Sequence, residues 1–177
     1  MPATPNYGKP LFTKADIQKK VQELGDRISK DYKGEELVVV GVMKGAFIFL
    51  ADLCRAIKVP VSVDYIGVSN FGARSKGRGA VRISSDLNEN IAGKHVLIVE
   101  DIINSGLTVE YLMKSLNARE PKSVKVCTLL DKAEKRRTGL TPDYVGFTIP
   151  SRYVVGYGLD YQDQYRNLPY IAVMGED

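Results

Sequence analysis

The sequence predicts an α/β protein built on a mostly parallel, twisted sheet flanked by helices. Continuously apolar, β-branched runs such as Leu37–Val42 (LVVVGV) and Val96–Ile103 (VLIVEDII) alternate with segments of helical periodicity. Strands that are apolar along both faces are typical of parallel sheets covered by helices on both sides. A length of 177 residues suits a single domain, 1–177, with at most a small appendage.

The first predicted helix covers Lys14–Tyr32. Apolar residues recur there at helical spacing, at Ile17, Val21, Leu24 and Ile28. Thr13 is a suitable N-cap with Asp16 three residues on, and Gly34 ends the segment. Two further helices are expected over Ala46–Ile57 and Thr108–Arg119.

Apolar runs bounded by glycine, proline or polar residues predict the other strands. These are Val61–Val68, Ala80–Ser85, Val124–Leu130, Asp143–Ile149, Tyr153–Asp160 and Pro169–Met174. The segment Ser69–Gly79 (SNFGARSKGRG) is rich in glycine and basic residues and has no apolar periodicity. We therefore expect a mobile loop there.

Composition narrows the class of protein. Hydrophobic residues make up 44% and charged residues 26%, as in ordinary globular proteins. No apolar run is long enough to span a membrane, and MPATPNYGKP has no signal-peptide core, so a cytoplasmic location is expected. Cys54 and Cys127 lie among apolar neighbours, which favours reduced core thiols, and the single histidine, His95, cannot complete a zinc site.

The charge is too small to indicate nucleic-acid binding by itself, since the net value is +4. Basic residues concentrate at 74–82 and 132–137. Each cluster is either a solvated face or a site for a substrate with several phosphates.

Parallel sheets bind ligands at the carboxyl ends of their strands. This rule directs attention to Met43–Gly45, Glu100–Thr108, Asp131–Lys132 and Gly156–Asp160.

The segment VLIVEDIINSGLT (Val96–Thr108) carries the most informative pattern. A hydrophobic strand ends in adjacent acids, Glu100 and Asp101, and a small-residue turn then leads into a helix. The backbone N–H groups of such a turn bind phosphate. The acids can hold sugar hydroxyls or a divalent metal with oxygen ligands at about 2.0–2.1 Å. The pattern indicates a ribose phosphate site, although acid pairs and Ser-Gly turns also occur without function.

This segment resembles the phosphoribosyl-pyrophosphate (PRPP) signature of type I phosphoribosyltransferases, and the resemblance runs from about Leu11 to the C-terminus. Three other segments resemble the hypoxanthine-guanine branch of that superfamily: VMKGAFIFLADL, LLDKAEKR and VGFTIPSRYVVGYGLDYQDQYRNLP. The resemblance implies the type I phosphoribosyltransferase fold. A small hood would come from residues 1–15 and 150–177, and a flexible active-site loop from residues 69–80.

The same resemblance implies an activity in purine salvage. The phosphoribosyl group of PRPP would pass to hypoxanthine or guanine, giving IMP or GMP and pyrophosphate. It further implies Mg²⁺ as cofactor and a homodimer or homotetramer. PRPP and a 6-oxopurine would be the small-molecule partners, with no nucleic-acid or membrane partner.

Site roles follow from the resemblance, position by position. Glu100 and Asp101 would hold the ribose hydroxyls with Mg²⁺ nearby. The 5-phosphate would lie on the turn after them, formed by Ser105, Gly106, Leu107 and Thr108 with the backbone of Asn104.

The pyrophosphate and purine subsites are assigned in the same way. Lys44-Gly45 would bind pyrophosphate through a loop whose peptide can be cis, and Arg166 would pair with it through its planar fork. The purine subsite would comprise Lys132, Tyr153, Val154 and Asp160, of which Asp160 would also contact a second Mg²⁺. The ammonium of Lys132 has only donors, so it suits the O6 of a 6-oxopurine and not the amino group of adenine. Tyr153 would stack on the base.

Two positions depart from the family pattern. Asn104 stands where the family usually has Asp, the candidate general base that accepts the N7 proton. Asparagine lacks that basicity, and general-base catalysis typically contributes about 10²–10⁴-fold, so we expect impaired chemistry with retained binding. In the closing loop, Asn70-Phe71 replaces the common Ser-Tyr pair and so lacks the tyrosine hydroxyl.

Three alternatives remain open. A catalytically weak sensor of purine nucleotides is favoured by Asn104. An RNA-binding regulator on the same fold is allowed by the positive charge but opposed by the purine-site segments. A phosphoribosyltransferase for xanthine is also compatible with Lys132.

Overall fold

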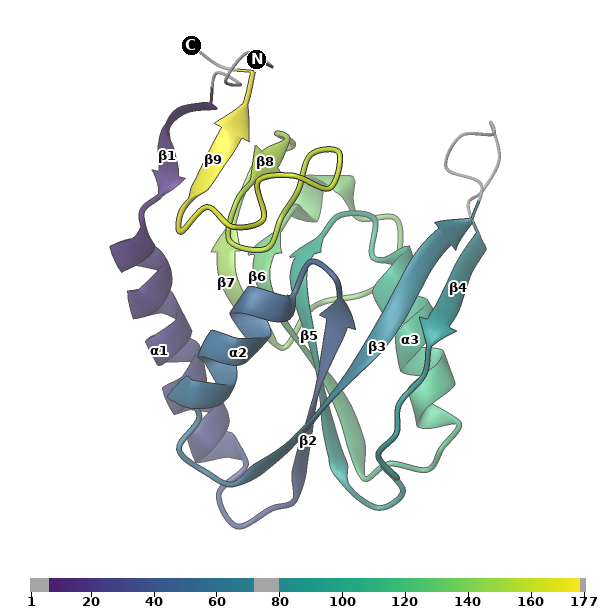
Figure 1. Ribbon diagram of the computed structural model, residues 1–177. Coiled ribbons are helices and arrows are strands. Elements are labelled where there is room, and N and C mark those ends of the chain that lie inside the picture. Colours follow the sequence, from purple (N-terminus) through teal and green to yellow (C-terminus); the bar gives the residue numbers. More distant parts are fainter. Residues whose placement is uncertain (1–6, 72–79, 176–177) are drawn as a thin grey trace.

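The computed structural model describes residues 7–71 and 80–175. Within these ranges the strands form a six-stranded sheet, in the order β4-β3-β2-β5-β6-β7, and a three-stranded sheet, in the order β1-β9-β8 (Figure 1). The strands are β1 (Tyr7–Phe12), β2 (Leu37–Met43), β3 (Val61–Phe71), β4 (Ala80–Ser85), β5 (His95–Ile103), β6 (Ser123–Asp131), β7 (Tyr144–Thr148), β8 (Val154–Val155) and β9 (Ile171–Met174).

The larger sheet confirms the predicted fold class. Strands β2, β3, β5, β6 and β7 run parallel to their neighbours, and β4 joins β3 as an antiparallel edge strand. Side chains of the inner strands are buried on both faces. Val39 packs into the hydrophobic cluster on one side, whereas Val38 and Val40 pack into the cluster on the other.

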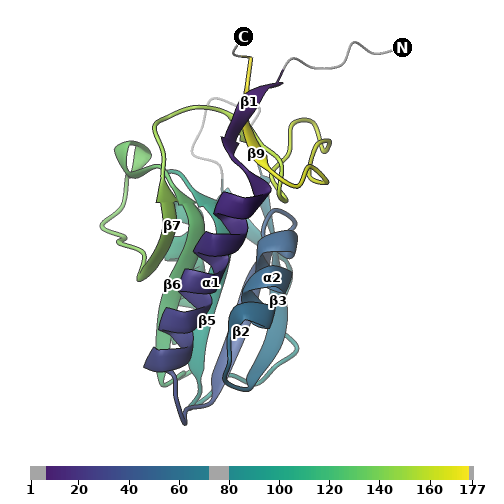
Figure 2. The same cartoon turned by 90° about the vertical axis from the view of Figure 1, so that its left-hand side faces the viewer.

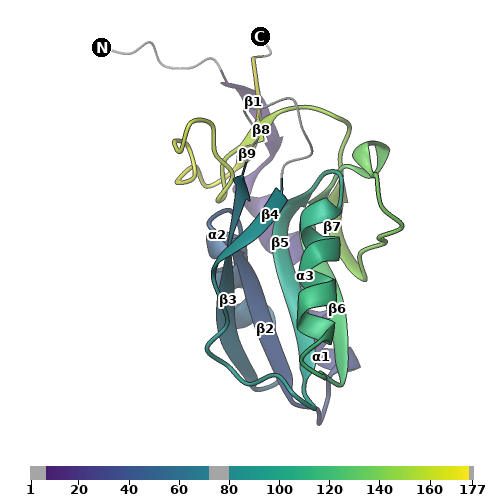
Figure 3. The same cartoon turned by 90° about the vertical axis from the view of Figure 1, so that its right-hand side faces the viewer.

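Helices cover both faces of this sheet, as the sequence predicts. Helices α1 (Lys14–Asp31) and α2 (Phe47–Ala56) lie side by side on one face (Figure 2), and α3 (Leu107–Asn117) lies on the other (Figure 3). The predicted N-cap of α1 is confirmed. The Asp16 amide donates to Thr13 Oγ1 at 3.2 Å, and the Thr13 amide donates to Asp16 Oδ2 at 2.9 Å.

The loop predicted at Ser69–Gly79 is wrong in its first three residues. Strand β3 continues to Phe71, where Asn70 and Phe71 pair with Val81 and Ala80 of β4. Backbone pairing with the returning strand therefore overrides the weak apolar pattern. Residues 72–79 of the expected loop lie outside the described residues.

The strand predicted at Tyr153–Asp160 is also wrong beyond its first residues, because only Val154–Val155 is extended in a sheet. Gly156, Tyr157 and Gly158 have φ values of 98°, 51° and 100°, so the chain turns there. Conversely, no apolar pattern predicts β1, which contains Pro10 and, among the described strands, pairs with β9 alone. Proline is tolerated in such edge strands.

In the described ranges, no helix has both the length and the apolar character needed to cross a membrane. Cys54 and Cys127 are both free thiols, half-buried and buried respectively. Burial raises the pKa of both, which fits the predicted role of small core residues.

Candidate active site

The candidate site lies where β2, β5 and β6 end. These strands are parallel and adjacent, so the residues that follow them, beginning at Lys44, Asn104 and Lys132, meet at one edge of the sheet. That edge faces the three-stranded sheet and the long segment between β8 and β9 (Figure 1). The strand ends to which the sequence rule directs attention therefore lie together.

Two adjacent acidic residues lie near the carboxyl end of β5. Glu100 is buried, with 8% of its surface exposed, and Asp101 Oδ1 accepts the Ile102 amide at 2.7 Å. Burial raises the pKa of Asp101 to about 6. Burial and the charge of Asp101 raise the pKa of Glu100 well above its usual value. The charge of Arg166 offsets part of this rise at Asp101, and a bound cation or hydroxyl donor would further stabilise the ionised pair.

A magnesium ion fits this acid pair. Mg²⁺ is usually bound by one or two carboxylates and completes its shell with water and substrate oxygens. No group of three or more His, Cys, Asp or Glu side chains within residues 7–71 and 80–175 could hold a metal ion. The protein itself would thus supply only part of the shell, from Glu100 and Asp101.

Hydrogen bonds from the segment after β6 fix the orientation of the turn after β5. Gly106 is left-handed, with φ 83°, and precedes α3 as its N-cap residue. Three successive carbonyl groups, from Ile103 to Ser105, accept hydrogen bonds of 2.9 Å from the Lys132 amide, the Arg136 guanidinium and the Arg137 amide, respectively. Ser105 and Thr108 are half-buried beside this turn and Leu107 is exposed, so the predicted phosphate residues lie together.

Gly45 is enclosed by two other parts of the site. A Cβ atom at Gly45 would overlap the Asp101 carboxylate, and one at Gly158 would overlap the Gly45 carbonyl. Glycine is therefore required at both positions for the loop after β2 to fit between the acid pair and the segment after β8. The cis peptide bond joins Met43 to Lys44, one position before the Lys44-Gly45 peptide expected from the sequence.

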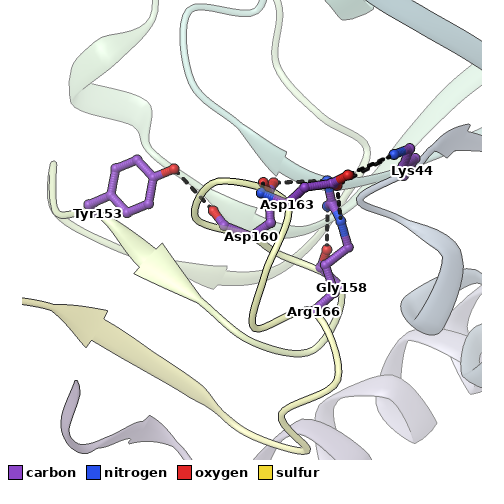
Figure 4. A network of polar contacts seen from close by, with 6 residues as sticks. All are labelled: Lys44, Tyr153, Gly158, Asp160, Asp163 and Arg166. Atoms are coloured by element: carbon purple, nitrogen blue, oxygen red, sulfur yellow. Dashed lines mark hydrogen bonds and ion pairs between the residues drawn. The ribbon is translucent and has the colours of Figure 1, made fainter. Parts of the chain in front are cut away.

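The predicted pyrophosphate residues form a network around Asp163 (Figure 4). Lys44 Nζ lies 3.1 Å from Asp163 Oδ2, and Arg166 Nη2 lies 3.0 Å from Asp163 Oδ1 and 3.0 Å from Asp160 Oδ1. Arg166 also donates to the Gly158 carbonyl at 2.8 Å. Lys44 and Arg166, together with Met43, Phe47 and Tyr65, line a pocket of about 470 Å³.

The predicted base-selecting lysine lies in a second pocket, of about 270 Å³. Its lining residues are Asn104, Ser105, Lys132, Lys135, Arg137 and Ser151. Burial, followed by the charge of Lys135, lowers the pKa of Lys132. An acceptor beside this ammonium would offset its desolvation, so the pocket suits a carbonyl oxygen.

Tyr153 and Val154 lie at the start of the segment that covers the site. Tyr153 is 55% exposed as a residue. Its ring packs edge-on against Tyr161, and its hydroxyl donates to the Asp160 carbonyl at 3.0 Å. Val154 is buried and pairs with Val173. Because Tyr153 is exposed, its ring is accessible for stacking on a base. The side chains of Asn70 and Phe71 lie outside the described part of the structure.

Sequence reasoning assigned no individual role to four residues of the site: Asp131, Arg136, Gly158 and Asp163. Asp131 and Arg136 form an ion pair across a short 3₁₀ turn, η1 (Ala133–Lys135). Both lie in the segment LLDKAEKR, where Lys132 alone has an assigned role. Asp163 precedes Arg166 by three residues, a spacing that could have suggested their ion pair.

Comparison with known proteins supports one family. The model of the phosphoribosyl transferase domain matches residues 11–162. A hypoxanthine phosphoribosyltransferase of Salmonella typhimurium is 47% identical over 92% of each chain. A crystal structure of a hypoxanthine-guanine phosphoribosyltransferase of Bacillus anthracis superposes with a TM-score of 0.91 at 46% identity, covering 96% of this chain and 99% of that one.

A further solved structure is that of a variant protein. It is described as an asparagine mutant in an analysis of an invariant aspartic acid in HPRTs, and it is 45% identical with a TM-score of 0.89. It covers 95% of this chain and 93% of its own. With most of its length matched by the family model and relatives of nearly half-identical sequence, the chain belongs to the phosphoribosyltransferase family, in its hypoxanthine-guanine branch.

Proposed function

We propose that this protein transfers the phosphoribosyl group of PRPP to hypoxanthine or guanine, forming IMP or GMP and pyrophosphate in purine salvage. The observation that carries the proposal is the convergence at one sheet edge of a phosphate-type turn, a buried acid pair and a half-buried lysine. These groups match the phosphate, ribose and base of a 6-oxopurine nucleotide, and the relatives are named for this reaction.

Each subsite has its own task. The amides of the turn and the hydroxyls of Ser105 and Thr108 bind the 5-phosphate. Glu100 and Asp101 orient the ribose hydroxyls. Lys44 and Arg166 bind the pyrophosphate, which leaves as a multiply charged anion and is stabilised by fixed cations.

Lys132 and Tyr153 select and hold the base. The Lys132 ammonium donates to O6, and an adenine amino group in that position would leave both donors without an acceptor, at a cost of about 1–3 kcal/mol. Stacking on Tyr153 adds roughly 1–3 kcal/mol by analogy with base–aromatic contacts in nucleic-acid complexes. Val154 supplies backbone contacts at the edge of the base.

Magnesium belongs to the proposal. One Mg²⁺ ion would lie beside Glu100 and Asp101 and a second would contact Asp160 on the pyrophosphate side. These ions would neutralise the charge of the departing pyrophosphate. Asp160 would have to exchange part of its contact with Arg166, since its Oδ1 lies 3.0 Å from that guanidinium.

Asn104 limits the rate in this proposal. It lines the Lys132 pocket, where the usual aspartate would accept the N7 proton of the purine. An amide oxygen can accept a hydrogen bond there but cannot carry the proton away. Asparagine is close to aspartate in size and shape, so the site should still bind its substrates. The second candidate, a sensor that binds purine nucleotides with little turnover, rests on this same residue.

Comparison of the protein with Asn104→Asp tests both candidates. We expect 6-oxopurines to react in both proteins, with a kcat about 100-fold or more higher for Asn104→Asp, at the low end of general-base contributions. Chelation of Mg²⁺ should abolish turnover in both. If neither protein converts any purine while GMP still binds, the sensor replaces the enzyme as the proposed function.

Three wider features complete the proposal. The small sheet β1-β9-β8 would serve as a hood over the base, and residues 69–80 as a closing loop that excludes water. A homodimer or homotetramer in the cytoplasm is the expected state, with no nucleic-acid partner.

A further inference from the structure

Three successive carbonyl groups, that of Ile103 at the end of β5 and those of Asn104 and Ser105 in the turn after it, point toward the segment after β6. They accept from the Lys132 amide, the Arg136 side chain and the Arg137 amide, each at 2.9 Å. In a trans peptide unit the N–H points opposite to the C=O, because the unit is planar. The amides of Asn104, Ser105 and Gly106 therefore point away from this segment.

The middle hydrogen bond of the three comes from the side chain of Arg136, whereas the other two come from backbone amides. Its Nη1 donates to the Asn104 carbonyl, and its Nη2 pairs with Asp131. The side chains of Arg136 and Asp131 are only 12% and 10% exposed, so the ion pair is largely shielded from water. A buried pair is costly unless its geometry and hydrogen bonds are complete. Here Nη1 of the guanidinium binds the Asn104 carbonyl and Nη2 binds the Asp131 carboxylate.

The turn also packs closely on this segment. A Cβ atom at Gly106 would lie 2.5 Å from Thr138 Oγ1 and 3.0 Å from Arg136 Cδ. Asp131 directly precedes Lys132, whose amide makes the first of the three bonds. One ion pair thus connects the turn expected to bind phosphate with the residue expected to bind the base.

We propose that Arg136 and Asp131 form a positioning pair that directs the amides of residues 104–106 toward the 5-phosphate. The inference rests on the proposed function, because it assigns the pair to the phosphate subsite of that same site. Arg136 acts through the backbone it holds and does not itself touch substrate. Its guanidinium geometry is required and its charge alone is insufficient, since lysine cannot bridge two partners in a fixed planar fork.

This role is isolated by measuring the phosphate preference of the site, which is how much more tightly the site binds GMP than guanosine. The dissociation constants of GMP and guanosine are measured by calorimetry, and their ratio reports the 5-phosphate alone. We expect Arg136→Met and Arg136→Lys to lower the preference for GMP by about tenfold or more, as for loss of a hydrogen bond to a charged group. Guanosine affinity should remain within about twofold, well below the change expected from one lost hydrogen bond.

Two further variants separate positioning from stability. The double variant Asp131→Asn/Arg136→Gln removes both buried charges, so its Tm should exceed that of Arg136→Met, yet its phosphate preference should stay low. Arg119→Met removes a more exposed arginine–aspartate pair, with Asp86, elsewhere in the protein. It should leave the preference unchanged.

The outcomes are distinguishable. A wild-type protein that binds GMP no better than guanosine would overturn the proposed function together with this inference. A wild-type preference that persists in Arg136→Met, or that Arg136→Lys retains in full, overturns the inference alone. A preference that recovers with Tm in the double variant assigns the pair a purely structural role.

Discussion

At the scale of single residues, the chemistry of the site comes from side chains held in unfavourable surroundings. Glu100 and Asp101 are two carboxyl groups placed together at the buried end of β5, and burial raises the pKa of both. Lys132 is partly buried beside Lys135, and its pKa is lowered. Each of these groups is stabilised only when a ligand supplies the missing opposite charge or acceptor, which connects burial directly with binding.

The acid pair should lower stability at neutral pH. Because the pKa of Asp101 rises to about 6, the folded protein binds more protons than the unfolded chain between about pH 4 and 6. Stability therefore falls as pH rises through that window. Asp101→Asn should raise the free energy of unfolding at pH 7.5 by on the order of 1 kcal/mol. The gain should vanish near pH 4, as measured by urea denaturation. An equal gain at both pH values would contradict this explanation.

Asp163 competes with a bound anion for two cations. Its carboxylate pairs with Lys44 and Arg166, both expected to bind pyrophosphate, and its hydrogen bonds with Lys44 and then Arg166 lower its pKa. Exposed pairs of this kind are weak, because water and salt screen them. Asp163→Asn should therefore bind inorganic pyrophosphate roughly two- to fivefold more tightly in calorimetry without Mg²⁺.

The matched control is Asp26→Asn, which removes the same charge from a pair with Lys58. It should leave pyrophosphate affinity unchanged. Weaker binding by Asp163→Asn would show instead that the carboxylate assists the anion.

At the scale of elements, contact between α1 and α2 fixes the layer that covers one face of the sheet. Gly25 of α1 lies against the end of α2, where an added Cβ would be 2.6 Å from Ala56 Cβ and 2.7 Å from its carbonyl carbon. Two helices can approach this closely only without a side chain at the contact. The α1–α2 layer in turn supports β2, whose end carries Lys44.

Gly25→Ala tests that contact. Alanine favours a helix interior over glycine by about 1 kcal/mol, yet overpacking of a tight contact costs about 1–3 kcal/mol. We expect a net loss of stability in urea denaturation. Lys19→Ala, an exposed position on the same helix, should change stability by less than about 0.5 kcal/mol. A gain in stability for Gly25→Ala would show that the helices separate readily.

The elements also show what sequence patterns can predict. Buried strands such as β2 and β5 carry their pattern in their own residues, and the capping box of α1 is local, so these predictions are confirmed. Strand β1 and the turn after Val155 are set by pairing and by positive φ values, which local apolar patterns do not encode.

The site, too, has a part that local sequence predicts and a part that depends on contacts between distant residues. The turn after β5 is contiguous in sequence, whereas the Lys44–Asp163 pair joins residues 119 positions apart and could not be predicted.

At the scale of the whole molecule, the architecture brings four distant segments together at one end. The carboxyl ends of β2, β5 and β6 meet at the upper edge of the large sheet, and the segment from Val154 to Ile171 crosses above them (Figure 1). Gly158 touches Gly45, and Arg166 and Lys44 share Asp163, so this segment and the sheet edge form one site. The fold class was predictable because it depends on repeated patterns, while this junction depends on single contacts.

The central claim is that this edge selects a 6-oxopurine and joins it to a phosphoribosyl group. A competition experiment tests it most directly. The protein is incubated with PRPP, Mg²⁺ and equal concentrations of hypoxanthine, guanine, xanthine and adenine, and the nucleotides formed are identified by mass spectrometry. We predict IMP and GMP, with no AMP, because Lys132 offers only hydrogen-bond donors to position 6 of the base. Formation of AMP at a comparable rate, or of no nucleotide at all even by Asn104→Asp, would contradict the claim.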